Sequence, residues 1–324
     1  MRVILIANPR SGSGKGLTRA TEFATELRTA GLSVNVLETG PNSSHLLNAG
    51  VLKKADALAV LGGDGTLNTA LDLARVNRVP IYHVPAGNEN LFAREFGMTG
   101  APSDLAEAVR AQRVLMADVG VANGRLFALM VSVGLDASVV HRVAQTRTTA
   151  VGHRAYVLPG LREIKSPCLP RLRIEVDGST LVEDQRGIVV IANSRHYGVD
   201  LDPARHAEID DGQLDIVFLP ARTRVGVLGW AVDLRLGWHL KRKRLVYAKG
   251  TQIRVESLED NKQAPVQLDG EAPGITPSGT TNEPSSQTPL SVGIEPATLP
   301  VLLPANAAGR IQPTPEAEPE VCAH

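Results

Sequence analysis

The sequence has few cysteines, few aromatic residues and no long hydrophobic run. Only Cys168 and Cys322 occur in 324 residues, and this pair gives neither a disulfide framework nor a metal-ligand spacing. We therefore expect a reducing, cytoplasmic setting. The N-terminal apolar run "MRVILIANP" is too short for a signal peptide, and no stretch approaches the length of a membrane-spanning helix. Any membrane contact is expected to be peripheral.

Net charge is also lacking, because 34 basic residues balance 34 acidic ones. Such a chain has no general electrostatic attraction for nucleic acid, so we expect no nucleic-acid partner, although a local basic patch is compatible with these numbers. The chain is nevertheless long, and 43% of its residues are hydrophobic. That composition is sufficient for a substantial core, and the length favours two domains.

The first third of the chain alternates between strand and helix patterns. Apolar runs predict strands at 2–7, 32–38, 57–61 and 79–84. Apolar residues at helical spacing predict a helix from Leu17 that stops before Gly31, and a second helix lies near 66–75. This alternation predicts parallel strands joined by helical crossovers, that is, an α/β domain. Ligands bind such sheets at the carboxyl ends of the strands.

Two glycine-containing loops follow the first and third predicted strands. The first, "NPRSGSGKG", fits neither the Walker A spacing nor the GxGxxG dinucleotide fingerprint. Its flexible amides, with Arg10 and Lys15, can still surround phosphate groups. The second loop, "GGDGT", presents Asp64 at the start of a helix. A carboxylate beside phosphates implies Mg²⁺ or a hydroxyl whose proton it takes, and an N-capping aspartate in a tight turn is the alternative.

From Val114 onward the pattern changes to short strands separated by turns. β-rich runs occur at 171–176, 187–193, 214–219 and 251–257, and Asp177-Gly178 is a hairpin signal. This pattern predicts an antiparallel β-sandwich with a more helical interruption at 135–165. We predict an α/β domain over 1–113, the sandwich over 114–304 with a flexible insertion near 272–289, and a disordered tail over 305–324.

Three motifs in order resemble the diacylglycerol kinase catalytic family, which includes sphingosine, ceramide and bacterial lipid kinases. They are "NPRSGSGKG", "GGDGTLN" and "VPAGNENLFAREFG", and the resemblance continues through "VQLDGE" to "LSVGIEPATLPVLLP". It implies an N-terminal three-layer α/β nucleotide-binding domain of the phosphofructokinase and NAD-kinase type, a C-terminal β-sandwich and an active site between them. It also implies ATP and Mg²⁺ as cofactors and a lipid hydroxyl at a membrane surface as the phosphate acceptor.

The resemblance also implies roles for individual residues. Catalysis would fall to Asp64, Asp269 and Glu271, of which the last two belong to "LDGE" and are placed to activate the acceptor hydroxyl. For "LDGE" a simple hairpin turn is the alternative. The implied nucleotide contacts are Asn8, Pro9, Arg10, Ser11, Gly12, Thr39, Gly62, Gly63, Asp64, Gly65, Thr66, Asn68 and Asn88.

A further acidic segment and one departure from the family pattern concern the metal and the substrate. In related bacterial kinases the segment matching "EIDDGQL" binds Mg²⁺, which implies Glu208, Asp211 and Gln213 here, and an empty hydrogen-bonded turn is the alternative. Leu91 stands where the family often has an aspartate, as is also the case in sphingosine kinases. The identity of the acceptor lipid is therefore left open. The sequence is also compatible with a homodimer.

Two other functions compete with a lipid kinase. NAD kinases and phosphofructokinases share the GGDG element, so a small-molecule kinase of the NAD-kinase type is one alternative. A non-catalytic lipid or nucleotide sensor is the other, since a fold does not imply a function. The presence of Asp64, Asp269 and Glu271 favours catalysis. An NAD-linked oxidoreductase is disfavoured because its glycine fingerprint is missing.

The segment "VGVLGWAVDLRLGWHLKRKRLVY" is the candidate for membrane contact. If it is helical, Trp230, Leu234 and Trp238 share one face, and four consecutive cations follow at 241–244. The alternative is that both tryptophans pack in the core and the cations form a solvated face.

Overall fold

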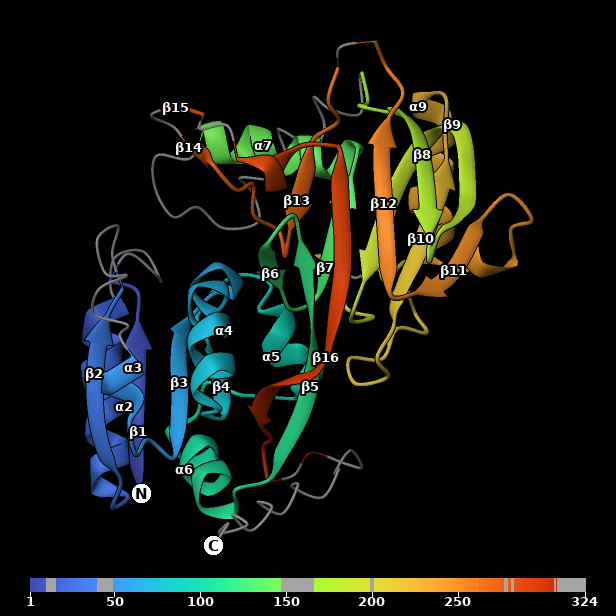
Figure 1. Ribbon diagram of the computed structural model, residues 1–324. Coiled ribbons are helices and arrows are strands. Elements are labelled where there is room, and N and C mark those ends of the chain that lie inside the picture. Colours follow the sequence, from blue (N-terminus) through green and yellow to red (C-terminus); the bar gives the residue numbers. More distant parts are fainter. Residues whose placement is uncertain are drawn as a thin grey trace, which may run out of the picture.

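The fold combines an α/β half with a β-sandwich half, as the computed structural model in Figure 1 shows. The structure describes residues 1–9, 16–39, 49–146, 166–198, 201–260, 262–276, 279–280, 283–305 and 307. This arrangement confirms the predicted fold class. No helix in these ranges is long and apolar enough to cross a membrane.

The α/β half is built on four parallel strands in the order β4-β3-β1-β2. The chain passes from β1 to β2 at one edge of the sheet and then returns past β1 to β3 and β4. Because crossovers are right-handed, this change of direction puts α2 on one face of the sheet and α3 and α4 on the other. The elements are β1 (Arg2–Ala7), α2 (Gly16–Thr29), β2 (Ser33–Glu38), α3 (Ala49–Leu52), β3 (Ala57–Gly62), α4 (Asp64–Asn77), β4 (Ile81–Pro85), α5 (Leu91–Phe96) and α6 (Pro102–Ala111).

The two long helices of this half bury one face each against the sheet. In α4 the buried Leu67, Ala70, Leu71 and Ala74 recur at helical spacing. In α2 the corresponding buried residues are Ala20, Phe23, Ala24 and Leu27. Strand β3 is buried along its whole length, which explains its continuous apolar run. The predicted strands and both predicted helices are therefore confirmed.

The second half consists of antiparallel strands, and its described residues include four helical segments. The hairpin at Asp177-Gly178 joins β8 to β9, and both residues have positive φ (47° and 79°), as a type I′ turn requires. The elements are β5 (Val114–Ala122), β6 (Arg125–Phe127), β7 (Met130–Val133), α7 (Leu135–Thr146), β8 (Arg171–Val176), β9 (Ser179–Ala192), β10 (Leu214–Pro220), α9 (Arg224–Arg235), η3 (His239–Lys241), β11 (Val246–Gly250), β12 (Gln252–Ser257), β13 (Val266–Leu268), β14 (Ile275–Thr276), β15 (Gly279–Thr280), η4 (Pro284–Ser286) and β16 (Leu290–Leu302).

Strands β5 and β16 connect the two halves. They run side by side along the middle of the molecule (Figure 1), and near its end β16 pairs with β4 in parallel through Val301 and Ile81. The last strand of the chain thus completes the sheet of the first half. The predicted boundary at 113/114 coincides with the start of β5, a strand that belongs to this shared sheet.

The predicted interruptions and tail are only partly described. Helix α7 covers the first part of the helical interruption, and 147–165 lies outside the described residues. Within the insertion near 272–289, β14 and β15 pair in antiparallel orientation, and Ser285 and Ser286 are buried. Of the predicted tail, Ala305 and Ala307 are described, and their carbonyls accept hydrogen bonds from Arg113.

Of the two interpretations of the segment at α9, core packing holds for Trp230 but not for Trp238. Trp230 and Leu234 are buried, and the Trp230 indole donates to the Pro220 carbonyl at 2.9 Å. The helix ends at Arg235, and Gly237 has a φ of 70°, so Trp238 no longer continues the helical face and is half-exposed. A different set of apolar residues on α9 faces the solvent.

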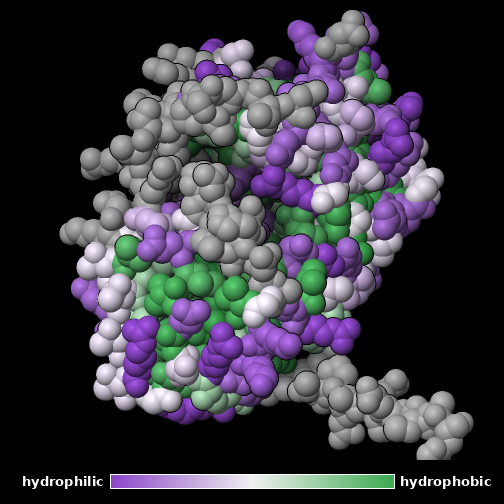
Figure 2. Space-filling view, turned by 60° about the vertical axis from the view of Figure 1, so that its left-hand side comes forward, coloured by the Kyte–Doolittle hydropathy of each residue, from purple (hydrophilic) through white to green (hydrophobic). Residues whose placement is uncertain are grey.

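The surface is mixed in character on the side that Figure 2 shows. Hydrophilic side chains cover much of it, and a hydrophobic area lies on its lower part, which belongs to the α/β half.

Candidate active site

The glycines of "GGDG" pack one strand-end turn against the next. Gly62 pairs with Pro85 at the carboxyl ends of β3 and β4. A Cβ atom on Gly87 would lie 2.7 Å from the Cα atom of Gly63, and one on Gly62 would lie 2.5 Å from Oγ1 of Thr66. These contacts are too close for any side chain. The glycines are thus required first by the packing of the two turns, and this packing also leaves bare backbone at the edge of the sheet.

The amino terminus of α4 opens at this edge. Its N-cap residue is Gly63, which provides no side-chain hydrogen bond. The N–H groups of a first helical turn have no partner within the helix and carry partial positive charge. The start of α4 therefore has the character of a phosphate-binding site.

Asp64 caps a different helix from its own. Its carboxylate accepts hydrogen bonds from the backbone N–H groups of Leu91 at 3.1 Å and Phe92 at 3.2 Å, the first two residues of α5. The sequence analysis offered capping as an alternative, but only within the turn of Asp64 itself. Leu91 contributes its backbone to this contact, so the absence of an aspartate side chain at position 91 does not disturb it.

A buried histidine forms a hydrogen bond to the glycine-rich turn. His83 on β4 is fully buried, and its Nε2 lies 3.0 Å from the Gly62 carbonyl. Burial lowers the pKa of His83, although the nearby charge of Asp64 opposes this shift. The imidazole is therefore neutral near pH 7, and Nε2–H donates to the carbonyl of Gly62. The same carbonyl accepts from the Ala86 N–H at 2.8 Å, which fixes the turn.

The motif "LDGE" forms a tight turn after β13. Leu268 and Glu271 exchange backbone hydrogen bonds of 2.9 and 2.8 Å, and Asp269 and Gly270 have φ values of 47° and 79°. The predicted alternative of a hairpin turn is thus correct as geometry. It does not exclude a catalytic role, because the turn determines where the two carboxylates point.

The Asp269 carboxylate is buried under this turn. It accepts hydrogen bonds from the N–H groups of Ala128 at 2.7 Å and of Leu129 and Met130 at 2.9 Å. Burial raises the pKa of the Asp269 carboxyl to about 6, the three N–H groups oppose the rise, and the charge of Asp64 adds to it. A carboxyl with this pKa can hold or release a proton near neutral pH.

Glu271 brings the two halves of the molecule into contact. Its side chain lies against Gly65, so closely that a Cβ atom there would overlap with Glu271 Oε1. Gly65 is the second residue of α4 and follows Asp64. The structure thus places the acidic turn of the sandwich directly on the glycine-rich turn of the α/β half, and Asp64, Asp269 and Glu271 lie together.

A buried network that the sequence analysis missed holds the acidic turn in place. Gln267 accepts from the Gly270 N–H at 2.7 Å and donates to the Ser132 hydroxyl at 2.7 Å. The hydroxyls of Ser132 and Tyr197 both donate to Asp136. Burial, followed by the charge of Asp136, raises the pKa of Tyr197 well above its usual value. A signal was present in the sequence, because the resemblance to the family also extends over the runs "LFALMVSVGLDASVV" and "VVIANSRHYG", which contain Ser132, Asp136 and Tyr197.

The remaining predicted nucleotide residues are partly placed. Asn8 and Pro9 follow β1, and the Thr39 N–H donates to the Ala7 carbonyl at 2.9 Å, so these residues lie at the strand-end edge. Asn68 lies one turn along α4 and Asn88 in the turn before α5. Arg10, Ser11 and Gly12 lie outside the described residues.

The predicted second metal site lies apart from these turns. The Asp211 carboxylate is 2.7 Å from the Lys249 ammonium and also accepts from the Gln213 N–H, while the side chains of Glu208 and Gln213 are exposed. A Mg²⁺ ion there would share Asp211 with a lysine. The site stays a prediction.

The buried Asp118, which the sequence analysis missed, holds this loop. Its carboxylate accepts from the N–H groups of Gly212 and Ala297 at 2.7 Å. Burial raises the pKa of Asp118, and these two hydrogen bonds oppose the rise. An aspartate inside the apolar run "VLMADVGVA" was the available signal.

The donor set near Asp64 suits one kind of metal. Within the described ranges, no three His, Cys, Asp or Glu side chains are grouped closely enough to hold a metal by themselves. Mg²⁺ does not need such a group, because it usually keeps several waters and binds one or two carboxylates together with phosphate oxygens. Asp64 beside the start of α4 fits that mode of binding.

An α/β half with a glycine-rich strand-end turn, facing a sandwich that contributes acidic residues, defines a two-domain protein of the NAD-kinase-like class. Family models match both halves: the "Diacylglycerol kinase catalytic domain" matches residues 2–122, and the "YegS C-terminal NAD kinase beta sandwich-like domain" matches residues 129–302. The chain therefore belongs to the diacylglycerol kinase catalytic domain family and carries a YegS-type C-terminal domain.

Individual relatives agree with this family. A diacylglycerol kinase of Mycobacterium tuberculosis is 28% identical over 263 residues, covering 79% of this chain and 85% of the relative. A diacylglycerol kinase of Bacillus subtilis is 25% identical over 290 residues, covering 87% and 93%. The crystal structure of a diacylglycerol kinase from Bacillus anthracis str. Sterne superposes with a TM-score of 0.64 at 18% identity, covering 94% and 98% of the two chains. This last similarity supports the fold.

Proposed function

We propose that the protein transfers the γ-phosphate of ATP to the hydroxyl group of a lipid such as diacylglycerol, on the cytoplasmic surface of a membrane. The observation that carries the proposal is the contact between Glu271 and Gly65. It brings an acidic pair from the sandwich to the helix start where phosphate groups would bind. Phosphoryl transfer needs these two parts together, because its catalysis consists mainly of positioning and charge neutralisation.

The α/β half would bind the nucleotide. The backbone at Gly63, which has no side chain above it, and the N–H groups at the start of α4 are suited to phosphate oxygens. Mg²⁺ would neutralise charge on the phosphates, and Asp64 is the carboxylate in position to hold it. Asp64 also binds the start of α5, so its orientation is already fixed before any ligand arrives.

The sandwich would act on the acceptor. The lipid oxygen attacks the γ-phosphorus, the bond between that phosphorus and the bridging oxygen breaks, ADP leaves, and the hydroxyl proton passes to a carboxylate. We assign the proton to Asp269, because a carboxyl with a pKa of about 6 is a better acceptor near neutral pH than an ordinary aspartate. The exposed Glu271 would orient the hydroxyl over Gly65.

The experiment is a transfer assay with a panel of acceptors. The purified chain, Mg²⁺ and radiolabelled ATP are mixed with diacylglycerol, monoacylglycerol, sphingosine or ceramide in detergent micelles, and with NAD and a sugar as non-lipid acceptors. We expect label in a lipid product and none without Mg²⁺. Label in NAD or sugar alone would support a small-molecule kinase, and no label in any acceptor would support a non-catalytic sensor.

A further inference from the structure

Helix α9 presents an apolar face to the solvent. Among the described residues, eight large hydrophobic side chains are exposed, and five of them lie within 225–238, with exposed fractions between 47% and 71%. Val225, Leu228 and Val232 follow one another at helical spacing, and Leu236 and Trp238, which come after the helix end, are exposed as well. These five residues form what we call the α9 face.

The opposite side of α9 anchors the helix to the protein. Val227, Trp230 and Leu234 are buried against the sandwich, and the Thr223 side chain caps the helix by accepting from the Gly226 N–H. An apolar set that is exposed on a helix already packed on its other side is not part of the core. The α9 face is therefore available to a partner.

The part of the sequence that contains the α9 face is rich in cations. Residues 222–250 contain eight Lys and Arg residues and one acidic residue, Asp233, although the chain as a whole is neutral. The eight cations are Arg222, Arg224, Arg235, Lys241, Arg242, Lys243, Arg244 and Lys249.

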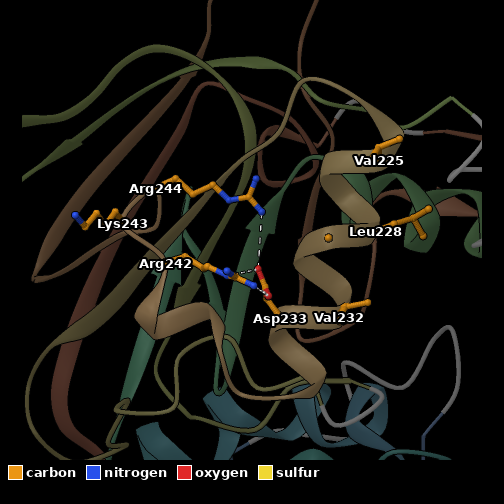
Figure 3. Close-up of a pocket in the computed structure, with 8 residues that line it drawn as sticks. Val225, Leu228, Val232, Asp233, Arg242, Lys243 and Arg244 are labelled. Carbon is orange, nitrogen blue, oxygen red and sulfur yellow. Dashed lines mark hydrogen bonds and ion pairs between the residues drawn. The ribbon is translucent and has the colours of Figure 1, made fainter.

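Three of these cations and Asp233 line a groove beside α9. The groove has a volume of about 790 Å³, with Val225, Leu228 and Val232 also among its lining residues. Figure 3 shows these three apolar side chains projecting from one side of the helix, while the segment 242–244 lies across from it. The apolar side chains point away from this segment in that view, and both groups contribute to the lining of the groove.

The two arginines of this groove are held in place. The Arg242 guanidinium donates two hydrogen bonds to the Asp233 carboxylate, from Nε at 2.8 Å and from Nη2 at 2.5 Å. Arg244 lies 3.8 Å from the same carboxylate and 4.1 Å from the centre of a Trp230 ring. One carboxylate cannot neutralise two arginines, and within the described ranges Lys241 and Lys243 form no ion pair. The cluster therefore keeps a positive charge in a fixed position.

We propose that the α9 face and its cations dock the protein on an anionic phospholipid bilayer. Apolar side chains of a surface helix enter the boundary between headgroups and acyl chains, Trp238 suits the headgroup region, and the cations attract anionic lipids. The proposal specifies the membrane contact of the proposed lipid kinase, and it rests on that function for the choice of a membrane over an acidic protein.

A second copy of the chain is the weaker candidate for this surface. In a symmetric dimer the same surface would face itself, so the cations of one subunit would lie opposite those of the other. Like charges in contact disfavour association. A bilayer that contains anionic lipids complements both the apolar and the cationic part.

The experiment measures co-sedimentation with vesicles in the absence of nucleotide. Vesicles of equimolar phosphatidylglycerol and phosphatidylcholine are compared with vesicles of phosphatidylcholine alone, at low salt and at high salt. The apolar variant changes Val225, Leu228 and Val232 to Ser, and the cationic variant changes Arg224, Lys241 and Lys243 to Gln. Arg242 and Arg244 stay unchanged, because Asp233 is buried and needs them. A charge-matched control changes Arg19, Lys53 and Lys262, which are exposed elsewhere.

We expect the wild type and the control to bind anionic vesicles, and binding to weaken at high salt because surface charges are then screened. Removing three cations should weaken binding on the order of a hundredfold, and the apolar variant about tenfold. Equal binding of all variants, or equal binding to neutral vesicles, overturns the proposal. So does a change in the molar mass of the apolar variant in solution without a change in vesicle binding.

A transfer assay in detergent micelles separates this proposal from the proposed function. Both α9 variants should keep wild-type turnover there, since the lipid is already dispersed. Vesicle binding without transfer to any lipid contradicts the kinase function only, whereas transfer with unaltered vesicle binding of both variants contradicts the docking surface only.

Discussion

The two halves of the molecule contribute to the candidate site in different ways. The α/β half contributes mainly backbone: the touching turns at Gly63 and Gly87 and the start of α4. The sandwich contributes the side chains of Asp269 and Glu271, held by a turn and by a buried network behind it. The backbone part follows from strand order, whereas the side-chain part depends on contacts between residues far apart in sequence.

Replacing the carboxylate of the sandwich should have the largest effect. Asp269→Asn removes the proposed proton acceptor, and we expect kcat to fall on the order of 10²- to 10⁴-fold with little change in nucleotide affinity. Asp64→Asn should have a similar effect through loss of Mg²⁺. Asp184→Asn is the control, because Asp184 is an exposed carboxylate in an ion pair with Arg171. The measurement is steady-state kinetics, with a thermal unfolding scan to check that each variant is folded. Wild-type activity of Asp269→Asn would show that Asp269 is not the proton acceptor.

Disrupting the contact between the two halves should have the next largest effect. Gly65→Ala puts a methyl group where Glu271 Oε1 lies, so the acidic side chain must move away. We expect kcat to fall on the order of 10²-fold, because moving a positioning group by about 1 Å lowers the rate by about that factor. Gly50→Ala is the matched control, because nothing lies within 4 Å of a Cβ atom at Gly50. If both alanine variants keep wild-type turnover, Glu271 does not act where it lies in the structure.

The pH dependence should report the sandwich half. The proton acceptor must be ionised, and burial raises the pKa of Asp269 to about 6. Activity is therefore present above pH 6 and falls about tenfold per pH unit below it. The measurement is kcat/KM over pH 4.5 to 8 with stability checked at each pH. A profile flat down to pH 5 would falsify the assignment.

The smallest effect should come from the network behind the turn. Gln267→Leu has a similar size but cannot accept the Gly270 N–H or donate to Ser132. Leaving such groups unpaired costs about 1–3 kcal/mol, so we expect about a tenfold loss in kcat. Gln267 acts through Asp269, so the apparent pKa of the pH profile should shift as well. A loss of stability with an unchanged pH profile would show a structural role only.

Parts of the site were predictable from the sequence because they depend on neighbours along the chain. The strand-helix alternation correctly located Gly62 to Thr66 at a strand end, and Asp177-Gly178 identified a hairpin. For the segment at α9 the sequence left two interpretations open, because helical spacing shows which residues share a face but not whether that face is buried. The buried Trp230 and the exposed Leu228 differ only in what packs against them.

The sequence by itself determined the strands, the helices, the two glycine-rich turns and the family. Those features depend on local pattern, since glycine, apolar spacing and turn residues act within a few positions. Only the tertiary structure decided that β16 returns to β4, that Asp64 caps α5 and that Glu271 lies on Gly65. These contacts join residues between 27 and 220 positions apart, and packing of the whole chain, rather than local preference, selects them.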